Sequence, residues 1–277
     1  MNEPVPVGFD AASQIAAFTR VACPYDMMST DSVIRGLFTD PDPMLVLASY
    51  DGGLEAIAAG VVRGERGWVK FLAVHPRAQL RGIATDLLAR IEAFCRERGA
   101  KTMEVGASAP FYVTPGVDVR ATEAICFFAS RGYQRSGDAV NQGVRLQDLP
   151  EPALPTSTAT TADLARLLPW VREHYPHWIP ELSRAVELGT CIVHEDIGFA
   201  CYDVNRDGWF GPMATRPGSG KKGVGTATLL AVLHRLRAEG YEHVDIAWSG
   251  PLLFYLKAVR ARISRVFWMY RKDLVGQ

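Results

Sequence analysis

Apolar residues recur at helical spacing in one segment of each half of the chain. The first set is Ile83, Leu87, Leu88, Ile91, Phe94 and Cys95, and the second is Val224, Leu229, Val232, Leu233 and Leu236. Residues three or four apart share one face of an α-helix, so each segment predicts a helix that packs one side on a sheet. Gly99 and Gly240 follow these segments and are typical of helix ends.

Short apolar runs around each predicted helix indicate strands. The runs after the helices are residues 103–105 and 244–247, and the hairpins before them are 45–50 with 56–63 and 191–194 with 198–204. Short turns favour antiparallel pairing in these hairpins. Each half then closes with a helix, 122–131 or 251–258, and a strand, 133–146 or 263–271. The sequence thus predicts an α/β (α+β) fold in which each half is a mixed, mostly antiparallel sheet with helices on both faces.

The two halves repeat one pattern. Pro76 and Pro217, Gly82 and Gly223, Ala84 and Gly225, and Thr85 and Thr226 are each 141 residues apart. Residues 149–161, LPEPALPTSTATT, lack apolar periodicity and read as a linker that leads into a short strand. We therefore expect two domains, residues 1–150 and 151–277.

The repeated loop has the features of an anion site. Gln79-Leu80-Arg81-Gly82-Ile83-Ala84 joins a strand to a helix, and unpaired backbone N–H groups converge where a helix begins. Gly223 and Gly225 offer the same small surface, and basic side chains flank both loops: Arg77, Arg81, Lys221 and Lys222. One such glycine is equally explained by turn chemistry, whereas two copies at one spacing favour a ligand. Neither GxxxxGK[ST] nor GxGxxG occurs.

The loop and its flanking strand and helix resemble motif A of the GNAT superfamily of acyl-CoA-dependent N-acyltransferases. The resemblance covers both halves, although Gly220 stands where the family usually has Gln or Arg. It implies that acetyl-CoA is the co-substrate, held by main-chain groups of a splayed strand and of the loop. The implied binding residues are Leu72, Ala73, Val74, Gln79, Arg81, Gly82, Ile83 and Ala84 in the first half, and Met213, Ala214, Thr215, Lys221, Lys222, Gly223, Val224 and Gly225 in the second.

The resemblance also implies a tyrosine that protonates the leaving CoA thiolate. Tyr255 matches that position in the second half, whereas the first half has Phe128, which cannot give a proton. The second half is therefore the expected catalytic domain, and the first half a degenerate copy. The alternative is that Tyr255 is an aromatic residue of the core with a hydrogen-bonded hydroxyl and takes no part in proton transfer. A base for the amine remains open among Glu195, Asp203, His243 and Asp245.

The acceptor amine is expected to contact aromatic and histidine side chains of the second half. These residues are His174, Tyr175, His177, Trp178 and Trp248. For each of them, a half-buried place in the core is an equally good explanation. Residues 246–251, 254–255 and 261–268 resemble tandem GNAT enzymes that acetylate glucosamine and glucosaminides, and residues 114–118 resemble their first half. Other tandem members acylate other amines, including the cysteine amine of thiol precursors. An amino acid, a thiol precursor or an aminoglycoside therefore remains an alternative acceptor.

Composition limits the partners and the compartment. Thirty basic and thirty acidic residues balance, which gives no reason to expect a nucleic acid or a membrane surface as partner. Five cysteines without a CxxC pair favour reduced thiols over disulfides or a metal site, so we expect a cytoplasmic protein without metal. No apolar run is long enough to span a bilayer. The oligomeric state, monomer or homodimer, stays open.

Two other interpretations remain. The chain could be a non-catalytic acyl-CoA-binding module, in which both loops bind ligand and no acceptor reacts. Alternatively, the chemistry lies in the first half, where Gln79 preserves the fuller loop and a water replaces the tyrosine. The acceptor, the acyl-chain length and the number of occupied loops are not fixed by the sequence.

Overall fold

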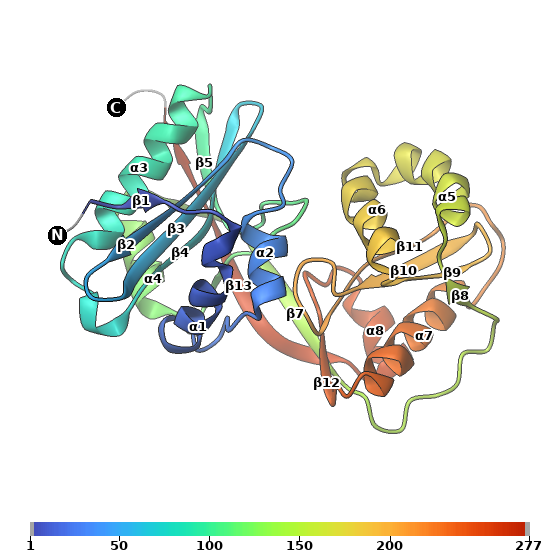
Figure 1. The fold of residues 1–277 in the computed structure, drawn as a ribbon. Coiled ribbons are helices and arrows are strands. Elements are labelled where there is room, and N and C mark those ends of the chain that lie inside the picture. The colour runs from blue at the N-terminus through green and yellow to red at the C-terminus, as the bar shows by residue number, and fades with distance from the viewer. Residues whose placement is uncertain (1–2, 275–277) are drawn as a thin grey trace. The chain divides into compact units, whose positions relative to one another are not determined.

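A computed structural model describes residues 3–274 and divides the chain into two compact units. The first unit contains residues 1–139 and 266–277, and the second contains residues 140–265. Each unit is a sheet covered by helices on both faces, and each is described separately below (Figure 1).

The first unit is built on antiparallel strands with one parallel pair. Its strands follow the order β1-β2-β3-β4-β5-β13-β7, and β6 also pairs with β13. Their bounds are β1 Val5–Pro6, β2 Met44–Tyr50, β3 Leu54–Arg63, β4 Arg66–Val74, β5 Thr102–Val105, β6 Val117–Asp118, β7 Gln134–Arg145 and β13 Arg262–Asp273. Pairing is parallel between β4 and β5 and antiparallel from β1 to β4 and between β5 and β13.

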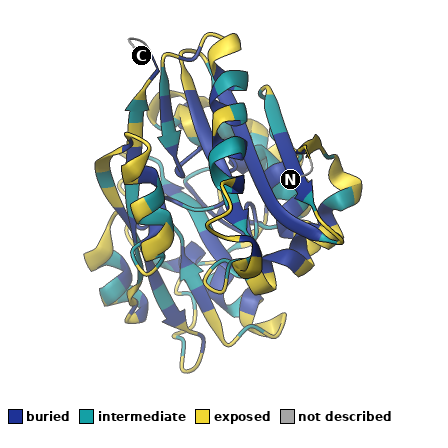
Figure 2. Cartoon of the chain, turned by 90° about the vertical axis from the view of Figure 1, so that its left-hand side faces the viewer, coloured by how far each residue is buried: buried dark blue, intermediate teal, exposed yellow. Residues whose placement is uncertain are grey.

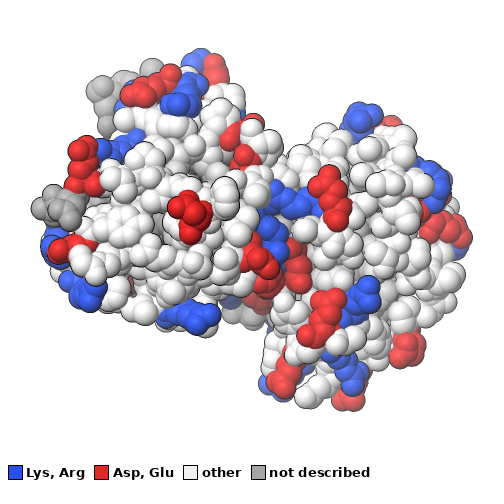
Figure 3. All heavy atoms as spheres, viewed as in Figure 1, with Lys and Arg blue, Asp and Glu red and all other residues white. Residues whose placement is uncertain are grey.

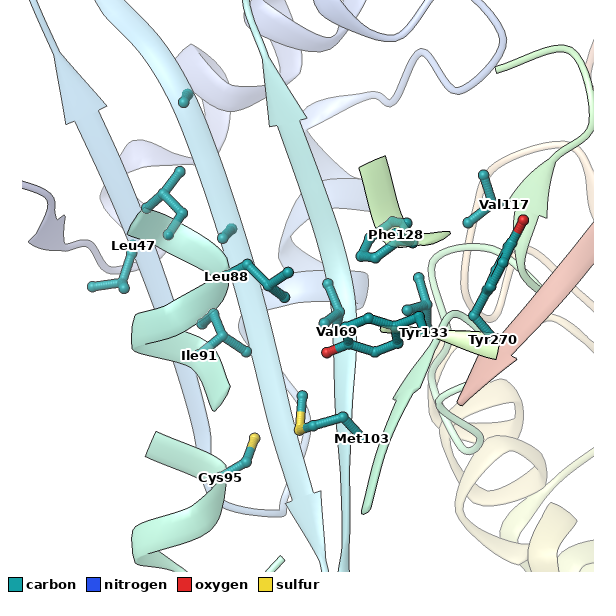
Figure 4. Packing of buried hydrophobic residues seen from close by; sticks show 14 of the residues in the cluster. Leu47, Val69, Leu88, Ile91, Cys95, Met103, Val117, Phe128, Tyr133 and Tyr270 are labelled. Carbon is teal, nitrogen blue, oxygen red and sulfur yellow. The ribbon is translucent and has the colours of Figure 1, made fainter. Parts of the chain in front are cut away.

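Helices cover the two faces of this sheet. The helices of the first unit are α1 Ala12–Ala22, α2 Thr30–Leu37, α3 Ile83–Glu97 and α4 Thr122–Ser130, with short 3-10 turns at Phe9–Ala11 and Pro76–Ala78. The apolar face of α3 packs on the strands through Leu88, Ile91 and Cys95, while α4 adds Phe128 beside Tyr270 (Figure 4). The helices α1 and α2 pack on the opposite face. The strands β2, β3 and β4 are therefore buried along most of their length, whereas β7 and β13 are largely half-buried or exposed, and each helix keeps one exposed side (Figure 2).

The second unit repeats this plan. Its strands follow the order β7-β12-β11-β10-β9-β8, and its only parallel pair is β11 with β12 among the described residues. Their bounds are β8 Ser157–Thr158, β9 Cys191–His194, β10 Gly198–Tyr202, β11 Trp209–Thr215 and β12 His243–Ile246. The helices are α5 Thr161–His174, α6 Ile179–Leu188, α7 Val224–Ala238 and α8 Leu252–Val259, with a 3-10 turn at Pro176–Trp178. α7 and α8 pack on one face, and α5 and α6 on the other.

The two halves of the sequence exchange their closing strands. The end of β7, which precedes the linker, pairs with β12 from Arg145↔His243 to Gln142↔Ile246 in the second unit. The end of β13 pairs with β5 from Tyr270↔Val105 to Asp273↔Thr102 in the first unit. The compact units thus differ from the continuous stretches 1–150 and 151–277, because each half gives its last strand to the sheet of the other.

The predicted elements of the repeat are present within one to three residues of their predicted ends. The helices α1 and α2 were not predicted. Residues 161–188 form two helices, α5 and α6, with a break at Tyr175. Tyr175 precedes Pro176 and has φ −142° and ψ 51°, outside the helical region that a residue before proline disfavours. Gly189 ends α6 with a φ of 71°, the left-handed cap that glycine favours.

Strand exchange predicts that neither half folds alone. A fragment of residues 1–150 lacks β13, so the edge of β5 is bare and the core loses Tyr270 and Leu274. We expect fragments 1–150 and 151–277 to aggregate when expressed separately and to co-purify as one cooperatively melting species when expressed together. Fragment 151–265, which lacks the part of β13 that belongs to the first unit, should not rescue fragment 1–150. Cooperative melting of fragment 1–150 alone would contradict this account.

Candidate active site

The helices α3 and α7 both begin at a glycine in the left-handed region. Gly82 has φ 84° and ψ −5°, and Gly223 has φ 85° and ψ −8°. No side chain caps either helix, so the N–H groups of each first turn face outward without a capping acceptor. A Cβ at Gly82 would meet nothing within 4 Å, and one at Gly223 would meet only Leu154 Cδ1, at 3.9 Å. Each helix start is therefore an open cradle of backbone donors.

In the first unit, the parallel strands beside this cradle separate. β4 and β5 pair from Arg66↔Thr102 to Val69↔Val105, and β4 then continues alone to Val74. His75 donates its N–H to the carbonyl of Glu55 on β3, at 2.7 Å. Along an antiparallel strand, alternate residues direct their N–H and C=O groups to opposite edges, so this bond shows which residues of β4 face β3. By that alternation, the N–H and C=O groups of Leu72 and Val74 point to the edge that no described strand covers.

The parallel strands of the second unit separate in the same way, after fewer paired residues. β11 and β12 pair only at Trp209↔Asp245 and Phe210↔Ile246, whereas β11 runs on to Thr215. Arg216 donates its N–H to the carbonyl of Ile197 at 2.7 Å, so the main-chain groups of Met213 and Thr215 face the free edge. Both units thus place unpaired strand donors beside the unpaired donors of a helix start.

Gly225 is where the elements of the second site meet. A Cβ at this position would lie 3.4 Å from Met213 Cε, 3.5 Å from Thr215 Oγ1 and 3.6 Å from Phe254 Cζ. The first turn of α7, the free edge of β11 and the start of α8 therefore converge at the glycine. In the first unit the corresponding residue is Ala84.

The charges around the two loops differ. Arg81 of the first loop is paired with Glu55 at 2.9 Å and lies 3.8 Å from Asp51, and Asp86 adds a carboxylate to the first turn of α3. Lys221 of the second loop pairs with Glu195 at 3.0 Å. The first turn of α7 contains no acid, and Lys222 makes no ion pair among residues 3–274. The second loop is therefore the more favourable of the two for an anion.

Tyr255 lies on α8 inside the apolar core of the second unit. It is 5% exposed, and its ring makes edge contacts with Phe210 and Phe254 at centroid distances of 6.1 and 5.0 Å. Burial raises the pKa of its hydroxyl well above the ordinary value of a tyrosine. The hydroxyl therefore keeps its proton at neutral pH, as a proton donor must.

Phe128 of the first unit is core. It packs against Tyr133 and Tyr270, with ring centroids 5.4 and 6.2 Å away (Figure 4). Tyr133 in turn donates a hydrogen bond to Glu92 at 2.9 Å, and Lys272 pairs with the same carboxylate at 3.0 Å. This corner of the first unit is closed by packing. Tyr255 is the fourth residue of α8, and the fourth residue of α4 is Ile125 rather than Phe128, so the sequence alignment of Phe128 with Tyr255 was wrong by three positions; neither side chain carries a hydroxyl.

Four of the five residues predicted to contact the acceptor form one aromatic group at the junction of α5 and α6. Tyr175 and Trp178 stack with centroids 4.9 Å apart and an interplanar angle of 14°. The ring centroids of His177 and Trp178 are 5.3 Å apart, and those of His174 and Tyr175 are 6.3 Å apart. Tyr175 and Trp178 also pack on the core beneath α5 and α6, which matches the alternative of half-buried core. Trp248 lies on another element, the loop after β12.

The separated strands β4 and β11 differ in the residue that follows their last parallel pairing: Lys70 in β4 and Gly211 in β11. Lys70 is the extra residue where β4 slips its register with β3, and its ammonium is fully buried against Asp40 Oδ2 at 2.5 Å. Asp40 also pairs with Arg63, whose guanidinium lies 5.4 Å from the Trp68 ring. The residue 141 positions later is Gly211, and a Cβ there would meet nothing within 4 Å.

The sequence reasoning missed this difference. A lysine within the apolar run WVKFLAV was its only signal, since a buried charge requires a partner.

The four possible bases are spread over the second unit. Asp245 lies next to the point where β11 and β12 separate, and its Oδ1 accepts a hydrogen bond from Ser264 at 2.9 Å. Asp203 accepts the N–H of Gly208 at 2.6 Å, and Glu195 pairs with Lys221. His243 is paired with Arg145 at the far end of β12. Of the four, Asp245 is the one placed beside the strand separation.

On the face shown in Figure 3, basic and acidic side chains are interspersed and form no large patch of one sign. Among the described residues, no helix has the length and apolar character that crossing a membrane requires. The same residues contain no group of three or more metal-ligating side chains.

Similar structures identify the fold. The chain superposes on a glucosamine N-acetyltransferase region of a fungal multi-domain β-N-acetylglucosaminidase (TM-score 0.78, 18% identity), covering 98% of this chain and 38% of that one. It also superposes on a tandem GNAT protein from the clavulanic acid biosynthesis pathway (TM-score 0.74, 15% identity, 99% of both chains). A third match is a GCN5-related N-acetyltransferase from Sphaerobacter thermophilus (TM-score 0.69, 19% identity, 98% of this chain and 95% of that one). The fold is the GNAT fold, present twice.

The sequence comparison agrees. Residues 13–113 match the model of the Acetyltransferase (GNAT) family, and no curated protein matches the chain. The chain therefore carries a GNAT-family domain, and its two units have the fold of tandem GNAT proteins. Family and fold support an acyl-CoA-dependent N-acetyltransferase in general, with acetyl-CoA as the family's co-substrate.

The burial of Tyr255 predicts its titration. Because its pKa is raised, Tyr255 stays neutral at a pH about one unit above the ordinary tyrosine pKa. Burial of the neutral phenol favours folding below the ordinary pKa, and this contribution is lost as the pH rises through the raised folded-state pKa. Difference absorbance of the phenolate should therefore show no contribution from Tyr255 when the protein is compared with Tyr255→Phe. A phenolate of ordinary pKa that disappears in Tyr255→Phe would show that the hydroxyl is not buried.

Proposed function

We propose that the protein transfers the acetyl group of acetyl-CoA to a small-molecule primary amine, and that the transfer takes place in the second unit. The observation that carries this proposal is the convergence at Gly225 of a glycine-started helix, a free strand edge and the start of the helix that contains Tyr255. The first unit has the first two features but lacks the third, since the fourth residue of α4 is Ile125 where α8 has Tyr255.

Main-chain groups of the second unit fit acetyl-CoA. The diphosphate would lie before the first turn of α7, where Gly223, Val224 and Gly225 present N–H groups and Lys221 and Lys222 supply positive charge. The pantetheine arm would pair with the free edge of β11, as an added strand does. The thioester carbonyl would then meet an N–H group of that edge, which stabilises the oxyanion that forms during attack.

The chemistry needs two proton transfers. Acetyl-CoA supplies the activated acyl group as a thioester. The amine nitrogen bonds to the thioester carbon, and the carbon–sulfur bond breaks. The nitrogen loses a proton to a base, for which Asp245 is placed beside the separated strands. The sulfur receives a proton from the Tyr255 hydroxyl, which burial keeps protonated.

An aminosugar is our proposed acceptor. One structural relative is a glucosamine N-acetyltransferase region, and segments of the second half resemble glucosaminide-acetylating enzymes. The stacked pair Tyr175–Trp178, with His174 and His177 exposed beside it, offers apolar ring faces and hydrogen-bonding groups suited to a sugar. The acceptor would approach from this face, where Gly211 leaves open space.

A second candidate function is that the first unit binds acyl-CoA without catalysing a reaction. Its helix start and its free strand edge repeat those of the second unit, which favours binding. The ion pair of Lys70 with Asp40 fills the face that Gly211 leaves open in the second unit, which disfavours an acceptor there. We therefore assign the first unit a bracing or ligand-binding role without transfer.

Removing the Tyr255 hydroxyl should slow turnover without weakening co-substrate binding. A general acid contributes about 10²–10⁴-fold, so kcat of Tyr255→Phe should fall by about 100-fold or more, while the dissociation constant of acetyl-CoA stays within about twofold. Steady-state thiol release and calorimetry give these two quantities. Tyr133→Phe, which removes a buried hydroxyl of the first unit, is the matched control and should leave kcat within about twofold. Equal turnover of Tyr255→Phe and the wild type would remove Tyr255 from the mechanism.

The proposed reaction itself is tested with a panel of amines. Acetyl-CoA consumption should be measured with aminosugars, aminoglycosides, amino acids and thiol precursors, and the proposal expects aminosugars to give the highest kcat/KM. A preference for another amine would replace the acceptor and keep the enzyme class. Thiol release at the background rate with every amine, despite measurable acetyl-CoA binding, would favour the binding-module alternative for the whole chain.

A further inference from the structure

The exchanged strand β7 supports the loop before α8, the helix that contains Tyr255. Ser249 donates its N–H to the carbonyl of Val140 at 2.7 Å, and its hydroxyl donates to Gln142 Oε1 at 2.6 Å. Gln142 Nε2 donates to the carbonyl of Leu252 at 3.3 Å, in the first turn of α8. A strand that precedes the linker thus holds the start of the helix that carries Tyr255.

The residues of this strand alternate between two faces of the second unit. Val144 packs in the core beneath α7 and α8, and Gln142 reaches α8 on the same side. Asn141 and Gly143 therefore point to the opposite face. Asp245 is the register partner of Gly143, and a Cβ at Gly143 would lie 3.9 Å from Asp245 Oδ1. Asn141 thus shares its face with the carboxylate that lies beside the separated strands.

The orientation of the Asn141 amide is fixed by its partner. The N–H of Trp248 lies 3.0 Å from the Asn141 side chain and can only donate, so the atom that it contacts is Oδ1. This bond holds Trp248 at a φ of 45°, a left-handed conformation that is strained for a bulky residue. Nδ2 is then a donor that is fully buried and has no hydrogen-bond partner in the part of the chain that the structure describes. Buried donors are seldom left unpaired unless a ligand or an ordered water completes them.

We propose that Asn141 binds the acceptor through Nδ2 and positions Trp248 through Oδ1. The ligand group that Nδ2 would recognise is an oxygen with a free lone pair, so the acceptor class is a primary amine with a hydroxyl oxygen near the amino group. This inference rests on the proposed function of the second unit. It makes the acceptor site a product of both halves of the sequence, since Asn141 comes from the N-terminal half and Tyr255 from the C-terminal half.

Two substitutions at Asn141 separate its two roles. Asn141→Asp keeps an oxygen for the N–H of Trp248 and removes the Nδ2 donor, so KM for glucosamine should rise by about tenfold or more with kcat little changed. Asn141→Leu removes both groups, so kcat should fall as well because Trp248 loses its support. For Asn141→Asp, KM for acetyl-CoA should stay close to the wild-type value, whereas the melting temperature should fall because the new carboxyl group is fully buried.

Gln142→Glu is the matched comparison on the other face of the same strand. It weakens the support of α8, so it should lower kcat and leave KM for glucosamine unchanged. An unchanged KM for glucosamine in both Asn141 variants would overturn the inference while leaving the proposed function intact. A parallel rise of KM for glucosamine and for acetyl-CoA would overturn it in favour of a purely structural role. Failure of the wild type to acetylate any amine would instead overturn the proposed function.

Discussion

Two parallel strand pairs that separate after a few residues leave unpaired main-chain groups in each unit. β4 parts from β5 after Val69, and β11 parts from β12 after Phe210. A sheet that stayed paired would satisfy its main-chain groups internally and would leave nothing to offer a ligand. Because each separated strand leads to a helix that begins at a left-handed glycine, both sources of unpaired N–H groups lie at one place in each unit.

The same plan occurs twice, and single residues make the two copies unequal. The Lys70–Asp40 ion pair lies at the position of the first unit where the second unit has Gly211, and Ile125 is the fourth residue of α4 where α8 has Tyr255. Strand exchange keeps the unequal copies together, because the sheet of each unit is completed by the other half of the sequence. Each copy is therefore necessary for the complete sheet of the other.

The sequence predicted the repeated features well, because they depend on local patterns. Apolar periodicity located α3 and α7, and glycines at one spacing located both helix starts; that these glycines are left-handed is seen only in the structure. The exchange of β7 and β13 could not be predicted, since a strand of one pattern pairs equally well with either sheet. Partners distant in sequence, such as Asp40 for Lys70 and Asn141 for Trp248, were missed for the same reason. The aromatic residues around Tyr175 were found, but their role stays a prediction.

The central claim is that main-chain amides at the glycine-started helices hold the CoA diphosphate. Calorimetry of CoA binding to Gly223→Ala and to its control Gly240→Ala tests it most directly. Both glycines have positive φ and room for a methyl group, so both variants should lose similar stability, about 1 kcal/mol. Only Gly223→Ala places its methyl before the first turn of α7, so it alone should weaken CoA binding, by about tenfold or more. Equal CoA affinity in the two variants would contradict the claim.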